Sequence, residues 1–437
     1  MLPTGHAAET WYEATAQRGL ARPKLSTETQ VEVCVIGGGL AGLNTALELA
    51  KRGKRVVLLE AKSLAWGASG RNGGFVSNGF ALGLDEIAAY AGLDAAKALF
   101  NLSRLGTEFV RREVAGDAGI KAGDGWIVAR RYDNGERLMA YRDRLERVFG
   151  DQRQFLATEE TRELLNSPRY FQSLYDPSAF HVHPLRYALL IARNAEAQGA
   201  MLHEQSAALE VSGMPGNWVV RTANGSVRAD HVVHAVSALD GNIHAVTGRA
   251  VLPVATYVAV TDFIEQDAIR TGSAISDSRR AGNYYRLVGE GRVLWGGAIT
   301  TKVSEPKRLA FRMREDLGSV FSQLRAVHMD YAWAGVMGYA RHKMPLIGGD
   351  GRGLWWATAF GGHGMNTTAM AGILLARAIV DGDDEYRRFV LFAPQWLGGP
   401  FGRAAVQASY WWMQLRDRFD EIKPSRPSSR TKRIFRA

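Results

Sequence analysis

The sequence predicts an α/β protein, α+β overall, in which a parallel sheet is combined with a second, largely antiparallel β domain. Residues 31–60 show the order strand, glycine-rich turn, helix and strand, and residues 353–380 show strand, glycine-rich turn and helix. Alternating β segments predominate between residues 250 and 300. Because the two glycine-bearing units lie near opposite ends of the chain, we expect the first domain to be discontinuous and the β domain to be interleaved with it.

The composition is that of a soluble globular protein with more than one domain. The chain has 437 residues, of which 46% are hydrophobic and 22% charged, and a single core rarely grows to that size. It has no apolar run long enough to cross a membrane, and its N-terminus lacks the pattern of a secretory signal. The one cysteine, Cys34, rules out an intrachain disulfide and fits a reducing cytoplasm, where a buried core thiol is expected.

The net charge of +10 bears on possible partners. An anionic small molecule, a nucleic acid or merely a basic surface would each be compatible with it. No DNA- or RNA-binding signature accompanies the charge, so we expect no nucleic-acid partner. Part of the charge lies in residues 423–437, a Pro/Ser-rich basic segment that we expect to be disordered.

The first unit carries the signature of a dinucleotide site. After the buried strand "VEVCVI", Gly37 permits a tight turn, Gly39 lets the backbone approach a pyrophosphate, and Gly42 lets the helix pack closely. The helix N-terminus near Leu40 offers free N–H groups to phosphates. Glu60, at the end of the strand "RVVLLE", is placed to accept hydrogen bonds from ribose hydroxyls.

Two further glycine-rich stretches favour FAD over NAD. "GASGRNGG" at 67–74 and "GGHGMN" at 361–366 are suited to enclose a broad ring system with backbone. The second is followed by a helix, whose positive dipole end would stabilise negative charge on a reduced flavin.

The remaining helices and strands are predicted from the periodicity of apolar residues and from residues typical of turns. A helix over 184–200 begins with proline at its first position, and "NG" at 224–225 marks a hairpin. We expect further helices over 85–115, 135–165 and 305–327, and strands at 126–130 and 231–236. Over 403–422 we expect a helix whose adjacent Trp411 and Trp412 pack on the domain; attachment to a membrane surface is the less favoured alternative.

Several of these motifs together resemble a known family. "VCVIGGGLAGLNTALELAKRGKRVVLLEA", "WGASGRNGG", "HVHP", "YYRL", "GRVLWGG", "YAWAG" and "GGHG" are similar to those of FAD-dependent amine and amino-acid oxidoreductases of the D-amino-acid oxidase superfamily, in particular the gamma-glutamylputrescine oxidase-like group. The resemblance covers roughly residues 11–385. It implies a Rossmann-type FAD-binding domain and a 67–74 loop that wraps the flavin ring and ribityl chain.

The resemblance also implies domain boundaries. The FAD-binding domain would comprise 30–90, 180–248 and 333–382, and the substrate domain 91–179 and 249–332. The rest would be an N-terminal arm over 1–29, a helical extension over 383–422, and the basic tail.

The predicted cofactor contacts combine these motifs with the resemblance, which alone supplies Ala208 and Ser237. They are Gly37, Gly39, Leu40, Ala41, Gly42, Glu60, Ala61, Trp66, Gly67, Ala68, Ser69, Arg71, Asn72, Gly73, Gly74, Ala208, Ser237, Gly362, His363, Gly364, Met365 and Asn366. No cysteine stands where some relatives attach flavin covalently, so noncovalent FAD is expected.

The candidate catalytic side chains are His363, Arg341 and His342, with flavin itself as the hydride acceptor. Arg341 suits a carboxylate or phosphonate as a bidentate partner, whereas relatives usually carry Thr-Arg-Asp where this chain has Ala340, Arg341 and His342. Lys343, which follows, is as readily a solvated loop charge. His363 would either touch the substrate or hydrogen-bond backbone.

Aromatic side chains of the β domain are the other substrate-binding candidates. Tyr257, Tyr285 and Trp295, with Arg341 and His342, would line the cavity, although alternation along a strand allows each aromatic side chain to face away instead. His181 and His183 have no carboxylate or cysteine partner nearby in sequence, so we expect capping or core roles and no metal.

The function expected is oxidation of a primary or secondary amine with an anionic end, by hydride transfer to flavin and hydrolysis of the imine to a carbonyl. An imino acid, an N-substituted amino acid or an aminophosphonate would suit the same residues. The strand "RVLWGG" lacks the lysine that the more distant sarcosine oxidases carry and that is thought to activate oxygen. This weakens the case for oxygen, so we expect either oxygen or another electron acceptor. The alternatives are a membrane-associated dehydrogenase that reduces a quinone and a non-catalytic FAD-stabilised binding protein.

Overall fold

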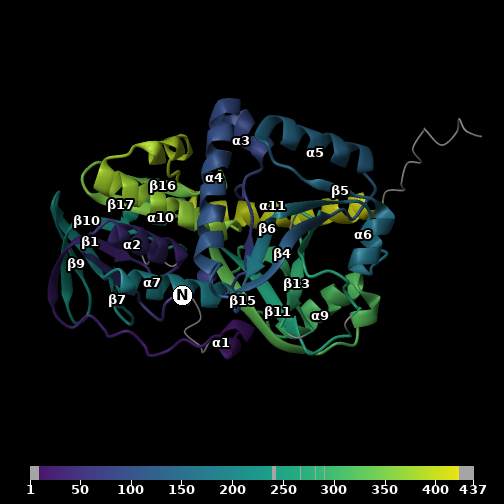
Figure 1. Cartoon of the computed structure of the whole chain (residues 1–437), viewed down its shortest axis with the longest axis horizontal. Coiled ribbons are helices and arrows are strands. Elements are labelled where there is room, and N and C mark those ends of the chain that lie inside the picture. The colour runs from purple at the N-terminus through teal and green to yellow at the C-terminus, as the bar shows by residue number, and fades with distance from the viewer. Residues whose placement is uncertain (1–8, 239–242, 266, 281, 290, 423–437) are drawn as a thin grey trace, which may run out of the picture.

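The computed structural model describes residues 9–238, 243–265, 267–280, 282–289 and 291–422, and the predicted tail over 423–437 lies outside them. Two sheets lie beside each other, and helix α4, Leu93–Val114, runs between them in the view of Figure 1. The predicted combination of a Rossmann-type domain and a second β domain is confirmed.

The first sheet is mainly parallel and is built around β1, Glu28–Ile36. Its strand order is β16-β17-β10-β1-β2-β7, and the hairpin of β8 and β9 extends from β10. The other strands are β2 Val56–Leu59, β7 Met201–His203, β8 Glu210–Met214, β9 Asn217–Arg221, β10 Ser226–His234, β16 Leu346–Gly349 and β17 Leu354–Thr358. The neighbours of β1, which are β10 and β2, are parallel to it, and β2 is buried along its whole length.

Close helix packing covers one face of this sheet. Helices α2, Leu40–Lys51, and α10, Gly364–Asp381, meet at Gly372, where a Cβ atom would lie 2.8 Å from the carbonyl carbon of Asn44. α4 packs on α10 in the same way, because a Cβ on Gly106 would lie 2.1 Å from the Asn366 carbonyl oxygen. α4 therefore joins the helical layer of the first sheet, although the predicted boundary at 91 gave it to the substrate domain.

The second sheet is antiparallel except where β12 lies parallel to β4. Its order is β15-β11-β14-β13-β12-β4-β6-β3, with β5 paired to β6. The strands are β3 Phe75–Val76, β4 Lys121–Ala129, β5 Gln154–Leu156, β6 Ser173–Val182, β11 Leu252–Thr261, β12 Ala274–Asp277, β13 Tyr284–Val288, β14 Arg292–Thr300 and β15 Met329–Tyr339. β15 pairs along its length with β11, so the predicted boundary at 333 divides a strand of the second sheet and is wrong.

The other helices differ from the predictions mainly in length. The predicted helix over 305–327 is reduced to α9, and β5 interrupts the one predicted over 135–165. The remaining helices are α1 Trp11–Thr15, α3 Leu84–Ala91, α5 Gly135–Phe149, α6 Thr158–Leu165, α7 Pro184–Ala197, α8 Ala245–Ala250, α9 Leu309–Val320, α11 Gly399–Ile422 and the 3₁₀ segments η1 Ala68–Gly70, η2 Ser322–Leu324 and η3 Glu385–Phe392.

The two faces of the second sheet belong to different cores. Val258, Leu294 and Trp333 lie in the core that also contains the helices of the first sheet. Tyr285 and Trp295 lie in a separate core that includes residues of α9. We call these the inner face and the outer face, respectively.

Candidate active site

The predicted dinucleotide turn has the geometry that its glycines require. Gly37 has φ of +109°, and a Cβ there would lie 2.9 Å from the Ala235 carbonyl oxygen. A Cβ on Gly42 would lie 1.9 Å from the Gly37 carbonyl oxygen. A side chain at either position would therefore displace backbone, which explains why the turn and the first turn of α2 contain glycine.

The start of α2 adjoins the 67–74 loop. Its N-cap, Gly39, supplies no side-chain cap, and the first N–H groups of a helix have no intrahelical acceptor. Leu40 N donates to Ser69 Oγ at 2.9 Å, and a Cβ on Gly39 would lie 3.0 Å from the same oxygen. The predicted phosphate-binding turn and the predicted flavin loop thus meet.

Glu60 lies at the edge of this turn. Its carboxylate accepts hydrogen bonds from Gly38 N at 2.7 Å and from Lys62 N at 2.8 Å. Burial raises its pKa, while these backbone donors act in the opposite direction. Ser206 N donates to the Glu60 carbonyl oxygen, which brings the loop that contains the buried Ala208 to the same strand end. The next residue, Ala61, is exposed.

Backbone carbonyl groups of the 67–74 loop are bound by residues far away in sequence. Trp333 Nε1 donates to the Arg71 carbonyl oxygen at 3.0 Å, Tyr12 Oη to that of Asn72 at 2.7 Å, and Arg286 Nε to that of Gly73 at 2.7 Å. The Asn72 side chain closes the loop internally by accepting from Gly74 N at 2.7 Å. The second sheet and the N-terminal arm therefore set the shape of the loop.

Protein packing is enough to explain the paired glycines of the loop. A Cβ on Gly73 would lie 2.9 Å from the Tyr284 ring. Gly74 has φ of +78°, and a Cβ there would lie 2.1 Å from the Val182 carbonyl oxygen. These two positions exclude side chains even before a cofactor is considered.

Arg286 is a buried cation that joins several parts of the site. It is 1% exposed, and it donates through Nη2 to the Val182 carbonyl oxygen at 2.9 Å and through Nη1 to His181 Nδ1 at 3.1 Å. Burial, with Arg286 nearby, lowers the pKa of His181 to about 3. His183 caps α7 by accepting from Arg186 N at 3.2 Å, which confirms the capping role expected of it.

Arg71 is the residue of the 67–74 loop whose backbone lies beside β15 of the second sheet. Its Nε donates to the Trp66 carbonyl oxygen at 3.0 Å, and its backbone is the nearest neighbour of the Gly335 Cβ position on β15. Burial lowers its pKa, and the carboxylates of Glu13 and Glu305 act against that effect.

The second predicted flavin loop precedes α10. His363 is the N-cap residue of α10, and its Nε2 lies 3.2 Å from the Ser77 carbonyl oxygen, so of the two roles considered the structure shows the backbone hydrogen bond. Burial lowers its pKa. Gly362 N donates to Tyr339 Oη at 3.0 Å. The next residues, Gly364 and the buried Met365, form the first turn of the helix.

Two predicted cofactor contacts have other neighbours in the protein. The Asn366 amide is buried and donates to the carbonyl oxygens of Gly79 and Ser103 at 3.4 and 3.3 Å. Ser237 Oγ lies 2.7 Å from the Cβ position of Gly338, at the end of β15. Asn366 therefore holds elements together by its side chain, and any contact that it makes with a cofactor would involve its backbone.

The aromatic substrate candidates lie on the outer face, so their predicted position in the cavity is wrong. Trp295 Nε1 donates to Asp316 Oδ2 on α9 at 3.0 Å, and its ring stacks on Tyr285 with centroids 4.9 Å apart. Tyr257 is in the same core and donates to the Ser304 carbonyl oxygen at 2.9 Å. Strand alternation points all three side chains away from the 67–74 loop.

Sequence reasoning missed Tyr12, Arg286 and Trp333, described above, and also Tyr284, the neighbour of Tyr285. The Tyr284 ring is the nearest group to the Cβ positions of Gly73 and Gly296, which places it on the inner face against the loop. Burial raises the pKa of its phenol. The same alternation occurs on β11, where Thr256 faces inward toward Tyr284 and the next residue, Tyr257, faces the outer core. The doubled tyrosine in "YYRL" was the available signal, because one of two adjacent strand residues must face inward.

The Arg-His-Lys turn lies on the side of the C-terminal extension. The His342 ring is 5.4 Å from that of Phe392 in η3, its Nδ1 accepts from Met344 N at 3.1 Å, and burial lowers its pKa. Arg341 and Lys343 are exposed, in agreement with the solvated alternative for Lys343. The predicted contact of Arg341 with substrate stays a prediction.

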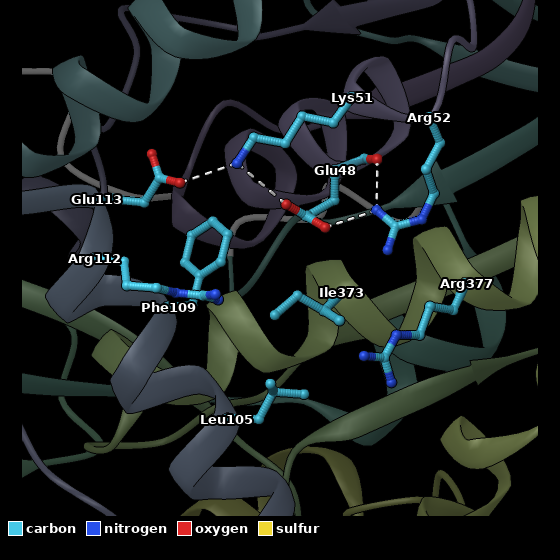
Figure 2. A pocket seen from close by; sticks show the side chains of 9 residues that line it. All are labelled: Glu48, Lys51, Arg52, Leu105, Phe109, Arg112, Glu113, Ile373 and Arg377. Carbon is cyan, nitrogen blue, oxygen red and sulfur yellow. Dashed lines mark hydrogen bonds and ion pairs between the residues drawn. The ribbon is translucent and has the colours of Figure 1, made fainter.

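A surface cavity at the other end of α2 is separate from this site. It measures about 500 Å³ and lies between α2, α4 and α10 (Figure 2). Lys51 bridges Glu113 and Glu48 at 2.9 and 3.4 Å, and Arg52 pairs with Glu48 at 2.7 Å. These residues stand at the C-terminal end of α2, away from the glycine turn, and their charges are largely paired with each other.

The residues at the N-terminal end of α2 fit FAD. The glycine turn and the helix start, whose N-cap Gly39 has no side chain, suit a pyrophosphate, the Glu60 carboxylate suits a ribose, and the 67–74 loop adjoins the helix start through Ser69.

Comparison with known proteins defines the class. The family described as "FAD dependent oxidoreductase" matches residues 32–378, and the chain belongs to this family. The predicted cofactor, FAD, and the predicted oxidoreductase class are thereby confirmed.

Particular relatives are similar over most of their length. A probable oxidoreductase OrdL of Haemophilus influenzae is 32% identical over 390 residues, which is 86% of this chain and 89% of the relative. Gamma-glutamylputrescine oxidoreductase of Escherichia coli is 31% identical, over 88% of this chain and 91% of the relative. Glycine oxidase from Geobacillus kaustophilus shares the fold, with a TM-score of 0.69 at 21% identity, over 84% of this chain and 99% of that structure.

Proposed function

We propose that this protein oxidises a primary or secondary amine that carries an anionic end, in the manner of a gamma-glutamylputrescine oxidase, with noncovalently bound FAD. When bound, FAD accepts the hydride from the carbon next to the substrate nitrogen. The imine product hydrolyses in water to a carbonyl compound and an amine or ammonia.

The observation that carries the proposal is the position of the 67–74 loop. One side of the loop contacts the N-terminus of α2 through Ser69, and the other contacts Tyr284, Arg286 and Trp333 of the second sheet. A cofactor that extends from the glycine turn past this loop would end beside the inner face. The inner face is then the wall against which a substrate is held.

The charges near that wall support an anionic substrate end. Arg71 is partly buried, and its Nε is used by the Trp66 carbonyl oxygen, which leaves the two Nη groups as a planar pair of donors. We propose Arg71, beside this wall, as the first candidate to bind a carboxylate, and Arg341, which is exposed on the side of the C-terminal extension, as the second. Tyr284, whose pKa burial raises, stays neutral at physiological pH and offers a hydroxyl for orientation.

The residues of the site do not by themselves select one substrate. A cyclic imino acid, an N-substituted amino acid or an aminophosphonate would satisfy the same donors. Gamma-glutamylputrescine is favoured because the E. coli enzyme named for it is 31% identical over 88% of this chain.

The test is anaerobic reduction of the purified, flavin-loaded protein. Gamma-glutamylputrescine, simple amines, amino acids, imino acids and aminophosphonates are added one at a time while the visible flavin spectrum is recorded. We expect bleaching by an amine with an anionic end, and the imine-derived carbonyl product is then identified by mass spectrometry. Bleaching by none of these compounds would contradict the proposal, and a protein that cannot bind FAD would contradict its basis.

The same experiment addresses the electron acceptor. At the inner-face positions of β14, Leu294 and Gly296 carry no charge, and the basic side chain of Arg292, at the start of the strand, is paired with Asp330 at 2.5 Å. We therefore propose that a carrier other than oxygen accepts the electrons. Slow return of the yellow colour on admission of air, and fast return with an artificial quinone, would support this, whereas fast return in air alone would contradict it.

A further inference from the structure

Helix α11 turns large apolar side chains toward solvent. Five of them are exposed by 43% or more: Phe401 at 88%, Trp411 at 64%, Trp412 at 61%, Leu415 at 43% and Phe419 at 59%. The prediction that Trp411 and Trp412 pack on the domain is therefore wrong. In a helix docked by its apolar face these side chains would point inward.

The exposed side chains form one continuous strip. Phe401, Ala405, Ala408, Trp412, Leu415 and Phe419 are all exposed. Each is three or four residues from the next, so they share one side of the helix. We call these six residues the apolar strip; Trp411 borders it.

The opposite side of α11 is polar and bound to the second domain. Glu421 pairs with Arg279 at 2.6 Å and with Arg131 at 3.3 Å, and Asp417 pairs with Arg280. Gln407 Oε1 accepts from Thr301 N at 2.8 Å. The acidic side chains of this helix are thus directed inward, and the helix is held by polar contacts while its apolar strip is left outside.

The charge next to the apolar strip is positive. Arg416 and Arg418 are exposed on α11, beside the strip. The sequence that follows the helix, residues 423–437, adds six further Lys and Arg residues and no Asp or Glu. An apolar strip with tryptophan, flanked by cations, matches the interface of a membrane with anionic headgroups.

We propose that α11 binds the surface of an anionic lipid membrane and lies in its interfacial plane. No helix among the described residues is long and apolar enough to cross a membrane, so the contact is peripheral. A second copy of this chain fits less well, because two such strips would bring together cations of the same sign and basic segments of the same sequence. The inference does not depend on which amine the protein oxidises.

The test is flotation of the full-length, flavin-loaded protein with vesicles. Vesicles of phosphatidylcholine with phosphatidylglycerol are compared with phosphatidylcholine alone. We expect binding to the anionic vesicles and a fall in the bound fraction of about tenfold for the double variant Trp412→Ser/Phe419→Ser. The matched control is Phe311→Ser, which removes a similarly exposed aromatic side chain from α9 and should float as the unchanged protein does.

A second variant separates charge from apolar contact. Arg416→Glu/Arg418→Glu leaves the apolar strip intact and should weaken binding to anionic vesicles several-fold, as should an increase in salt to about 0.5 M. All variants are checked for flavin content and thermal unfolding, which these exposed positions should not change. Absence of flotation, equal flotation of the Trp412/Phe419 variant, or a stable dimer in sedimentation analysis that this variant dissociates would overturn the proposal.

Discussion

The glycine turn of the first sheet and the inner face of the second sheet differ in how their geometry arises. At the turn, most decisive contacts are made within residues 37–69, as between Gly42 and the Gly37 carbonyl oxygen and between Leu40 N and Ser69 Oγ, and the approach of Gly37 to the Ala235 carbonyl oxygen is the exception. At the inner face, the 67–74 loop depends on Tyr284, Arg286 and Trp333, which are more distant in sequence. The glycine turn is therefore mainly a local motif, whereas the shape of the 67–74 loop depends on packing against the second sheet.

The largest expected effect concerns the outer face of the second sheet. Replacement of the buried Trp295 by Ala removes its stacking on Tyr285 and its bond to Asp316, and should cost about 4 kcal/mol of unfolding free energy. Chemical denaturation measures this. Because the side chain faces α9, the remaining folded protein should keep its Michaelis constant for the amine, and a large increase of that constant would restore a substrate role for Trp295.

Arg286→Met tests the dependence of the loop on the second sheet. The change leaves the carbonyl oxygens of Gly73 and Val182 without their donor and should cost about 3 kcal/mol of stability and much of the FAD affinity. Flavin retention on gel filtration and urea unfolding report the two effects. Arg286→Lys keeps the charge but not the planar donor set, so an intermediate loss is expected; unchanged flavin binding in both variants would count against the loop's dependence on Arg286.

Gly42→Ala tests the local motif. Its Cβ would lie 1.9 Å from the Gly37 carbonyl oxygen, so the turn must shift at a cost of about 2 kcal/mol and FAD should bind more weakly. Gly116→Ala is the control, because no atom lies within 4 Å of its Cβ position and its φ is not positive. Isothermal titration of the flavin-free proteins with FAD compares them, and equal affinities would show that the turn is not the cofactor site.

Tyr284→Phe tests whether Tyr284 faces the inner side of the second sheet while the adjacent Tyr285 faces the outer side. Loss of the hydroxyl should lower kcat/KM for the amine about tenfold with little change in stability, if Tyr284 orients substrate. Tyr285→Phe should leave kcat/KM unchanged, since its ring lies against Trp295 and Phe321. Both variants are compared by steady-state kinetics with the substrate that bleaches the flavin. A larger loss of kcat/KM for Tyr285→Phe than for Tyr284→Phe would show that the two faces have been assigned the wrong way round.

The smallest expected effect is a pH dependence at His183. Burial lowers its folded-state pKa to about 3, whereas an unfolded histidine titrates near 6.5. As the pH falls below about 6.5 the unfolded chain takes up the proton first, so stability declines toward pH 3, by at most about 1.4 kcal/mol per pH unit for this group. His183→Asn keeps a helix cap and removes the titration, so its unfolding midpoint should fall less between pH 6 and pH 5; parallel curves would disprove the assignment.

The sequence was informative where function depends on local geometry. The spacing of Gly37, Gly39, Gly42 and Glu60 predicted the nucleotide turn, and the structure places these residues together at the ends of two neighbouring strands. The alternation of side chains with a period of two residues also predicted the second sheet. It could not predict which of Tyr284 and Tyr285 faces inward, because shifting the pattern by one residue exchanges the faces.

Other features could not be deduced because they depend on partners elsewhere in the chain. Gly73 and Gly74 exclude side chains because of Tyr284 and Val182, which no local pattern connects to them. The orientation of α11 was missed for a related reason. Its acidic residues bind Arg131, Arg279 and Arg280 of the second domain, so the side of the helix that faces the domain depends on partners that no local pattern identifies.

The contacts of Arg286 have a consequence for the order in which the protein is made. During synthesis, the glycine turn and the 67–74 loop leave the ribosome long before Arg286 and Trp333. The strands of the nucleotide turn can begin to pair early, but β10 and β17 also come later, and the loop carbonyls acquire their donors after β13 and β15 exist. A nascent chain therefore carries a recognisable nucleotide motif through most of its synthesis and completes the cofactor cradle near the end of it.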